Sequence, residues 1–159
     1  MKPLIVILLT AFSSSALACQ TPPPESLRAA WTTWRAATLK DEPGVSARLY
    51  KFPFLLLSPY DGDRPLRVTR AAFSDNYQNL FASFSANDEN QFRQDLRKTK
   101  DSEYIAKFEF NEKTCQLTRP VRIHDTNFIY DQKAGWLVQS IYMPEAYGLF
   151  KDGVTDGIR

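Results

Sequence analysis

The sequence predicts an α+β domain in which N-terminal helices pack on an antiparallel sheet. Apolar side chains recur at helical spacing in residues 25–39 and again in residues 70–84, which predicts two amphipathic helices. From Ser102 onwards the apolar period changes to two, as expected for half-buried strands. Helices followed by a run of short strands indicate one domain with segregated α and β parts.

The first helix is predicted over residues 25–39, where two tryptophans, Trp31 and Trp34, share the apolar side. Residues 40–44 contain a Pro-Gly pair that breaks this helix. Residues 45–51 are long enough for about two further helical turns. A proline that follows shortly afterwards prevents that second helix from continuing.

Residues 52–57 form the longest apolar stretch after the N-terminal region and predict a strand buried on both faces. A turn is expected at residues 59–63 and a short pairing at residues 66–68. Thr69 is suited to cap the next helix, and a shorter helix with an acidic, capped start is predicted over residues 87–97. The longer helix has one apolar face, made of Phe73, Tyr77, Leu80, Phe81 and Phe84.

The second half of the chain predicts the sheet. Residues 102–111 alternate between apolar and polar side chains, which indicates a half-buried antiparallel strand. The returning strand, residues 115–123, is interrupted by Pro120, at a bulge or a sheet edge. Residues 128–130 and 136–142 are separated by a turn and predict a further hairpin.

The N-terminus has the pattern of a bacterial export signal: a positive Lys2, an apolar run, and small residues that end at Ala18. The apolar run is about half the length that a membrane-spanning helix needs. We therefore expect a periplasmic or secreted protein. The predicted divisions are a signal peptide, residues 1–18; a proline-rich segment, residues 19–24; a single α+β domain, residues 25–150; and a polar tail, residues 151–159.

Cys19 and Cys115 are the only cysteines, and they leave two alternatives open. In an oxidising compartment they would form one disulfide. In the other alternative, Cys19 is the acylated first residue of a membrane-anchored lipoprotein, residues 22–24 are a stiff tether, and Cys115 is a buried thiol. Ala16 stands where lipoprotein signals usually carry leucine, which favours the disulfide.

The charge balance excludes several classes of function. The chain has 20 Lys and Arg against 18 Asp and Glu, so loss of Lys2 with the signal leaves 19 against 18. Such a balance provides no electrostatic reason to bind nucleic acid or an anionic membrane surface, and membrane attachment is expected only if Cys19 is acylated. The single histidine and the two cysteines lack the spacing of a structural zinc site. We expect neither a metal nor a cofactor.

The sequence contains no recognisable catalytic motif, and we assign a catalytic role to none of its residues. His124 precedes Asp125, but their surroundings are typical of a loop, and neighbours on a strand point to opposite faces. The carboxylates Asp75, Glu103 and Glu109 are candidate general bases if burial beside a tyrosine raises their pKa.

Aromatic residues make up 13% of the chain and provide the candidates for a ligand pocket. Aromatic side chains on one face of a strand either fill the core or line a cavity. The candidate pocket residues are Phe54, Tyr77, Tyr104, Phe108, Tyr130 and Trp136.

Three packing motifs occur on the first helix, the first strand and the third helix: Trp31-x2-Trp34-Arg35-x-Ala37, Phe52-Pro53-Phe54 and Phe73-x3-Tyr77-x2-Leu80-Phe81. With the element order over residues 25–143, they resemble the NTF2-like superfamily, the cone-shaped α+β fold that includes nuclear transport factor 2 and ketosteroid isomerase. The resemblance implies a curved sheet closed on one side by helices, around a cavity used for catalysis, ligand binding or dimerisation. Fold alone does not specify which of these uses applies.

From these observations we expect an exported, non-enzymatic binding or protein-interaction module of the bacterial envelope, with an immunity or inhibitor protein as one variant. Its partner would be another envelope protein or a small apolar ligand. The alternative is a cavity-based isomerase or hydratase that uses a buried carboxylate and a tyrosine. A homodimer formed through the sheet face is a third hypothesis.

Overall fold

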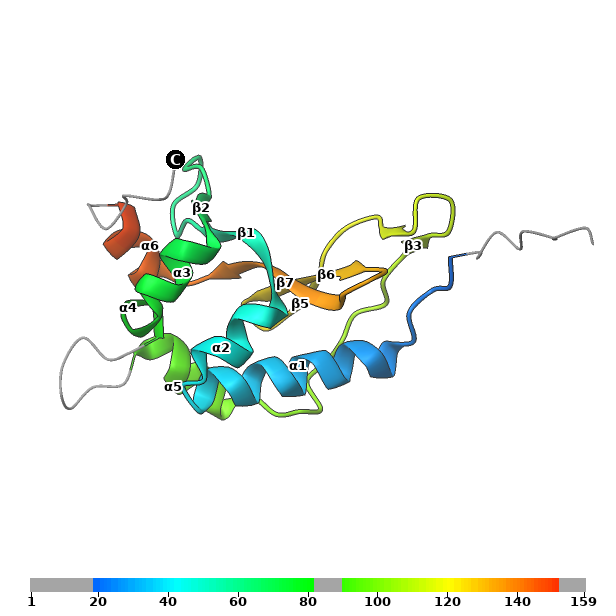
Figure 1. The fold of residues 1–159 in the computed structure, drawn as a ribbon, viewed down its shortest axis with the longest axis horizontal. Helices are drawn as coiled ribbons and strands as arrows, with labels where there is room; N and C mark the ends of the chain where they lie inside the picture. The colour runs from blue at the N-terminus through cyan, green and yellow to red at the C-terminus, as the bar shows by residue number, and fades with distance from the viewer. Residues whose placement is uncertain (1–18, 82–89, 152–159) are drawn as a thin grey trace, which may run out of the picture.

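The computed structural model describes residues 19–81 and 90–151 and confirms the α+β class (Figure 1). The helix α1 lies along one face of the sheet, the helices α3 to α6 gather at one end, and the β3–β4 hairpin lies at the other end. The helical elements are α1 (Pro24–Leu39), α2 (Pro43–Ser46), η1 (Ala47–Leu49), α3 (Arg70–Asp75), α4 (Tyr77–Phe81), α5 (Gln91–Lys98) and α6 (Pro144–Lys151). The strands are β1 (Tyr50–Leu57), β2 (Leu66–Val68), β3 (Phe110–Asn111), β4 (Gln116–Leu117), β5 (Val121–Ile123), β6 (Thr126–Asp131) and β7 (Gly135–Tyr142).

The main sheet has five strands in the order β2-β1-β7-β6-β5. It is mixed rather than antiparallel throughout, because β1 pairs in parallel with β7 while the other neighbours are antiparallel. The prediction of a fully antiparallel sheet is therefore wrong at this one pairing. The parallel pairing arises because β1 and β7 are distant in sequence, so no tight turn forces them to run in opposite directions.

The first helix packs on the sheet through its two tryptophans, as the sequence predicts. Trp31 and Trp34 are fully buried, and each meets Phe128 of β6 edge-on, at ring-centroid distances of 6.4 Å and 6.2 Å. Buried indole N–H groups need an acceptor. Trp31 donates to the Lys100 carbonyl and Trp34 to the Tyr50 hydroxyl, each over 3.0 Å. These bonds join α1 to the chain after α5 and to the start of β1.

The strand β1 is found where it is predicted, but only one of its faces is buried. Tyr50, Phe54 and Leu56 are buried, whereas Lys51 and Pro53 are exposed. Burial thus alternates along β1 although its sequence is continuously apolar, because helices cover only one face of the strand. The helix predicted over residues 45–51 is present as α2 and η1, which begin earlier, at Pro43, and end at Leu49, because the chain joins the sheet at Tyr50.

The helix predicted after Thr69 is present in two pieces. Thr69 caps α3 by accepting a hydrogen bond from the Ala72 N–H over 3.1 Å. Asn76 separates α3 from α4, and its side-chain amide donates to the Ala72 carbonyl over 3.0 Å. An asparagine side chain that bonds to a nearby main-chain carbonyl in this way competes with the hydrogen bonds of a helix. The predicted core residues of the two helices are buried, namely Phe73, Tyr77, Leu80 and Phe81. The fifth, Phe84, lies outside the described residues.

The helix α5 begins after Asn90, whose side chain accepts a hydrogen bond from the Phe92 N–H over 2.8 Å. The start predicted at residues 87–89 lies outside the described residues. Phe92 and Leu96 are buried, as predicted.

The helix α6 has no counterpart among the predicted elements. The sequence predicts that the sheet ends near Pro144, and it does, but a proline is also a favoured first residue of a helix. Ala146, Tyr147 and Phe150 of α6 are buried. The Tyr147 hydroxyl donates to the Arg64 carbonyl over 2.9 Å, so α6 holds the loop that leads into β2.

The strand predicted over residues 102–111 is mostly absent. Only Phe110–Asn111 form a strand, which pairs with β4, and residues 103–109 have no regular secondary structure. Periodicity indicates which side chains share a face, but a strand also needs a partner for its main chain. In the described part of the chain, this segment lies beside no such partner.

Candidate functional site

The six predicted pocket residues do not surround one cavity. Phe54 and Tyr77 are buried at the helical end of the sheet, where the ring centroid of Phe73 lies 5.9 Å and 5.3 Å from theirs. Tyr104 is 82% exposed and belongs to no cluster of rings. The strand that would have placed Tyr104 beside the other candidates is absent, so its assignment to a pocket stays a prediction without support from the described residues.

Phe108, Tyr130 and Trp136 form a second aromatic cluster at the hairpin end. The ring centroid of Trp136 lies 5.3 Å from each of the other two, and its indole N–H donates to the Ser26 hydroxyl over 2.8 Å. The Phe110 ring of β3 extends the cluster, at 6.1 Å from Tyr130. These contacts attach the β3–β4 hairpin to the main sheet.

The hydroxyl groups of two buried tyrosines, Tyr50 and Tyr77, form hydrogen bonds inside the core. The Tyr50 hydroxyl accepts the Trp34 N–H, and the Tyr77 hydroxyl is hydrogen-bonded to the Ser46 hydroxyl at 3.1 Å. Burial raises the pKa of both Tyr50 and Tyr77 above that of a free tyrosine. Both groups are neutral at physiological pH and join neighbouring elements of the fold.

The three candidate general bases lie apart from these tyrosines. Asp75 and Glu109 are exposed and Glu103 is half-buried. Glu103 accepts the Lys100 N–H over 2.9 Å, and Glu109 accepts the Thr118 hydroxyl over 3.4 Å. Within the described ranges, no hydrogen bond joins any of the three carboxylates to a tyrosine.

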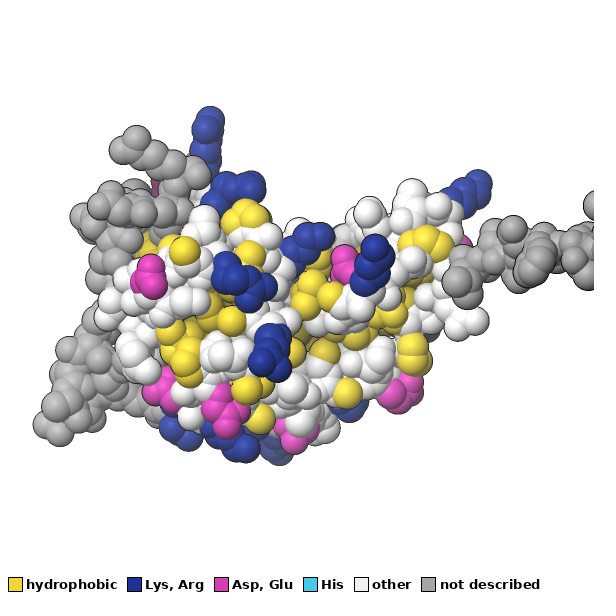
Figure 2. Space-filling view, viewed as in Figure 1, with side chains coloured by type: hydrophobic (Ala, Val, Ile, Leu, Met, Phe, Trp, Pro, Cys, Tyr) yellow, Lys and Arg dark blue, Asp and Glu magenta, His cyan; other side chains and the backbone are white. Residues whose placement is uncertain are grey.

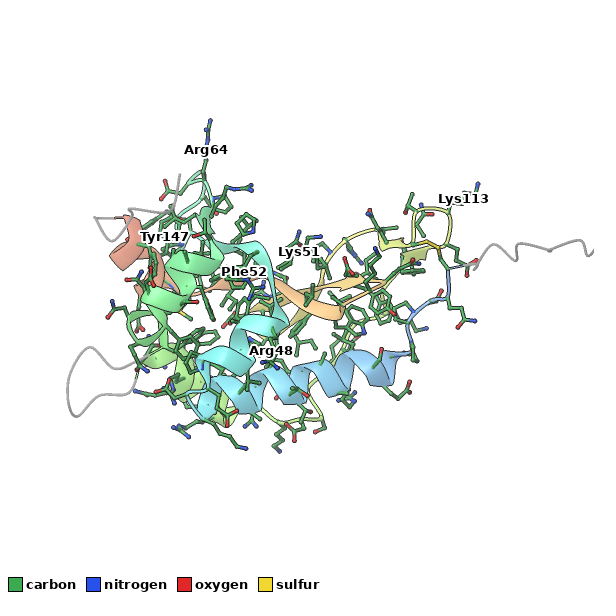
Figure 3. The ribbon with its side chains drawn as sticks, in the orientation of Figure 1. Arg48, Lys51, Phe52, Arg64, Lys113 and Tyr147 are labelled. Atoms are coloured by element: carbon green, nitrogen blue, oxygen red, sulfur yellow. A yellow bond between two sulfur atoms is a disulfide. The ribbon has the colours of Figure 1, made fainter. Side chains whose placement is uncertain are left out.

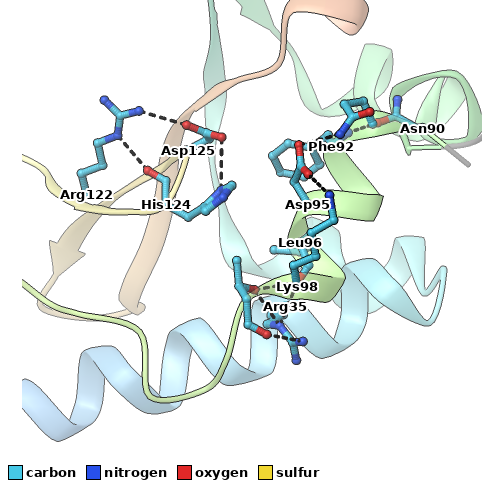
Figure 4. Close-up of polar contacts among 11 residues, drawn as sticks. Arg35, Asn90, Phe92, Asp95, Leu96, Lys98, Arg122, His124 and Asp125 are labelled. Carbon is cyan, nitrogen blue, oxygen red and sulfur yellow. Dashed lines mark hydrogen bonds and ion pairs between the residues drawn. The ribbon is translucent and has the colours of Figure 1, made fainter.

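His124 and Asp125 lie in a loop between strands, as the sequence predicts, and their side chains meet there. They lie in the tight turn between β5 and β6, where His124 adopts the left-handed conformation with a φ of 50°. His124 Nδ1 is 3.2 Å from one Asp125 oxygen, and Arg122 donates to the other over 2.9 Å (Figure 4). Arg122 also donates to the His124 carbonyl over 2.7 Å. These contacts close the turn.

A groove of about 680 Å³ lies between the segment 114–120 and the strands β6 and β7. We call it the 114–120 groove. The segment around β4 lines one side of the groove and the β6–β7 turn lines the other, and Lys51 of β1 is a further lining residue. Figure 3 places Lys51 between the helical end and the hairpin end of the molecule. In the face shown in Figure 2, basic side chains and an acidic one border a hollow in this region.

The lining of the 114–120 groove is mainly polar. The charged residues of the lining are three cations, Lys51, Arg119 and Lys133, and one carboxylate, Asp131. The neutral polar side chains of the lining are those of Thr114, Gln116, Thr118, Gln132 and Gln139. Such a set offers several hydrogen-bond donors and a net positive charge to a ligand.

Asp131 is already engaged by the turn that it begins. One of its oxygens accepts the Lys133 and Ala134 N–H groups, each over 2.9 Å. The Ala134 and Lys133 N–H groups, with help from the charges of Lys51 and Lys133, lower the pKa of Asp131. The carboxylate therefore stays ionised, and the cations outnumber it in the groove.

The segment 114–120 is tied to the N-terminal segment by the predicted disulfide. Cys115 lines the 114–120 groove and is bonded to Cys19, with a distance of 5.4 Å between their Cα atoms. That distance is typical of disulfides. The bond occupies the sulfur that acylation of Cys19 would use, and it is consistent with an oxidising location outside the cytoplasm.

Of the six predicted pocket residues, only Tyr130 lines the 114–120 groove, and the charged residues of the groove were not predicted as a site. Lys51, Arg119 and Asp131 are far apart in the sequence and fall in segments that were predicted as a helix, a strand with a bulge or edge, and a turn. No local motif contains them. The one local signal is the cluster of polar and turn residues at 131–135, which is also what any hairpin turn shows.

The described residues offer neither a metal-binding cluster nor a membrane-spanning helix. Residues 19–81 and 90–151 contain no group of three or more His, Cys, Asp or Glu placed to hold a metal ion. Within those ranges no helix has both the length and the apolar character needed to cross a membrane. Comparison with protein-family models, curated proteins and solved structures finds no match for this chain. The resemblance to NTF2-like domains therefore stays a prediction.

Proposed function

We propose that this chain is an exported, non-enzymatic binding module of the bacterial envelope that holds an anionic carbohydrate in the 114–120 groove. The N-terminal pattern of an export signal and the Cys19–Cys115 disulfide support a location outside the cytoplasm.

The observation that carries the proposal is the groove itself. Its volume of about 680 Å³ lies within the range of about 300–1,000 Å³ that is typical of small-ligand sites. Three cations share it with a carboxylate that main-chain N–H groups already engage. A ligand that carries its own negative charge would be attracted there.

The neutral part of the lining favours a sugar over a simple ion. The amide side chains, Gln116 and Gln139 among them, each offer a donor and an acceptor, as sugar hydroxyl groups require. Tyr130 adds an aromatic side chain to the same lining. The proposed ligand is thus polar, and differs from the small apolar molecule that the aromatic residues indicated in the sequence.

The proposal is tested with an oligosaccharide of uronic acid units as the probe and its carboxyl-reduced, neutral form as the comparison. Isothermal calorimetry on the exported chain should detect the acidic probe and a weaker response to the neutral one. Loss of one charge-assisted hydrogen bond in K51Q or K133Q should weaken binding about tenfold or more. Binding should also weaken as salt is raised, because salt screens the attraction.

The matched control is K113Q. Lys113 lies at the tip of the β3–β4 turn (Figure 3) and is not itself a lining residue of the 114–120 groove, although its neighbour Thr114 is, and its loss changes the net charge by the same amount. Equal weakening in K113Q would attribute the binding to overall charge and contradict the assignment to the groove. Equal affinity for the acidic and neutral probes would also contradict it.

A further inference from the structure

The segment 104–108 is an unpaired stretch of main chain with a strand-forming sequence. It runs between α5 and β3 as a coil (Figure 1). Tyrosine, isoleucine and phenylalanine, which favour strands, occupy positions 104, 105 and 108. Among the described residues, no hydrogen bond is made by the main-chain N–H or C=O groups of residues 104–108. Local sequence and structure disagree here, which is expected where a partner is missing.

The segment is held in place at both ends. Before it, Arg28 of α1 donates to the carbonyls of Asp101 and Glu103, over 3.0 Å and 3.2 Å. After it, the Thr118 N–H donates to the Glu109 carbonyl over 3.0 Å. Phe108, the last residue of the segment, packs against Trp136. The segment therefore has little conformational freedom left to lose when a partner binds.

The outer edge of β3 continues into this segment. The bond from Thr118 directs the main-chain groups of Glu109 towards β4. Because successive residues of a strand direct these groups to opposite edges, Phe110 presents its N–H and C=O to the edge away from β4. In a strand extended towards the N-terminus, Phe108 and Ala106 present theirs to that same edge. Tyr104 is 82% exposed, and Ala106 and Lys107 are also exposed.

A slot of about 350 Å³ lies along the same segment. Ile105, Ala106, Lys107 and Phe108 line one side of it, and residues between Thr21 and Arg28 line the other. Peptides that add to a sheet edge gain affinity from main-chain hydrogen bonds and specificity from pockets that take alternate side chains. The slot supplies such a pocket next to the unpaired main chain.

We infer that residues 104–110 bind an extended segment of a partner protein by strand addition, with an apolar side chain of the partner in the slot between residues 105–108 and α1. The occupant is a polypeptide because the unsatisfied groups are a row of main-chain donors and acceptors, which only another main chain matches along its length. Lys107, within the row, limits indiscriminate pairing, as charged residues do on natural edges. The site is separate from the 114–120 groove and adds a protein partner to the proposed function.

The test uses the full chain, expressed with its own leader and recovered after export. A phage-displayed library of random peptides, about ten residues long, is selected for binding to the wild type and, in parallel, for binding to A106P. The A106P substitution removes one N–H of the outer edge, and this N–H makes no hydrogen bond in the described structure. Circular dichroism and the melting temperature should therefore match those of the wild type.

The most enriched peptide is then labelled with fluorescein and its affinity measured by anisotropy. We expect A106P to weaken binding about tenfold, as for one lost hydrogen bond. The matched variant K107P removes the neighbouring N–H, which faces the other edge, and should change affinity much less. N-methylation along the peptide should weaken binding at every second residue. Binding of the acidic oligosaccharide should be the same in A106P as in the wild type.

Several results would overturn the inference. Failure to enrich any peptide on the wild type over A106P would show that no strand adds to this edge. Equal losses in A106P and K107P, or an N-methylation profile without a period of two, would show that binding does not depend on strand pairing. A dimer in sedimentation experiments that A106P dissociates would replace the partner protein with a second copy of this chain.

Discussion

Replacement of both cysteines by serine should destabilise the protein strongly while leaving its fold in place. The disulfide joins Cys19, before α1, to Cys115, beside β4. The hairpin keeps other attachments without it, because Phe108 and Phe110 pack on the rings of Trp136 and Tyr130. The double variant C19S/C115S therefore tests the covalent constraint more than it tests the packing of the hairpin.

The expected magnitude follows from the length of the closed loop. The bonded residues are 96 positions apart, and the loss of chain entropy on closing such a loop corresponds to about 4.7 kcal/mol of stability. Domains of this size have free energies of unfolding of about 5–15 kcal/mol. The bond would thus provide a third or more of the total in a protein of average stability.

Urea unfolding followed by tryptophan fluorescence measures the effect, since all three tryptophans are buried. We expect the free energy of unfolding to fall by about 3–5 kcal/mol in C19S/C115S, with a steeper slope against urea, because the unfolded chain without the cross-link exposes more surface. Reductant should destabilise the wild type by a similar amount. It should not affect the double variant, which is the control for any direct action of the reductant.

The reasoning would be refuted by a loss below about 1 kcal/mol in a variant whose circular dichroism is unchanged. Intact-mass analysis of the exported wild-type chain provides a separate check. The mass should rise on reduction by the hydrogens added to the two sulfurs. An acylated mass would instead support the lipoprotein alternative for Cys19.

Three further predictions concern the core and the helix caps. F128A should cost about 3–5 kcal/mol in urea unfolding, because the Phe128 ring is buried against both tryptophans of α1; a loss below that of a surface alanine variant would contradict this packing. The free energy of unfolding should fall above about pH 10, where tyrosines of the unfolded chain ionise while buried Tyr50, whose pKa is raised, keeps its proton; Y50F should reduce the slope of that fall, and an unchanged slope would count against it. T69A and N90A should each cost about 1 kcal/mol, since each side chain caps a helix, and chemical denaturation that shows no loss in either would disprove the caps.

Much of the fold was predictable because it depends on local patterns. The apolar face of α1, the cap at Thr69, the β6–β7 hairpin and the end of the sheet near Pro144 all follow from spacing and from the preferences of single residues. The α+β class followed from the order of these patterns. The pairing of Cys19 with Cys115 was predictable as one of two alternatives, because only two cysteines were available.

The errors share one physical cause, which is that pairing and covering are decided between distant parts of the chain. The parallel pairing of β1 with β7 and the one-sided burial of β1 depend on which elements lie beside them.

The sequence by itself determined the class of fold, the amphipathic helices, the order of most strands and the two possible fates of Cys19. These depend on neighbours a few residues apart, whose chemistry is visible along the chain. Only the tertiary structure decided where the polar groove lies, since Lys51, Arg119 and Asp131 meet through the packing of separate strands. It also decided that residues 104–108 lack a partner, because a strand forms only where a second main chain satisfies its hydrogen bonds.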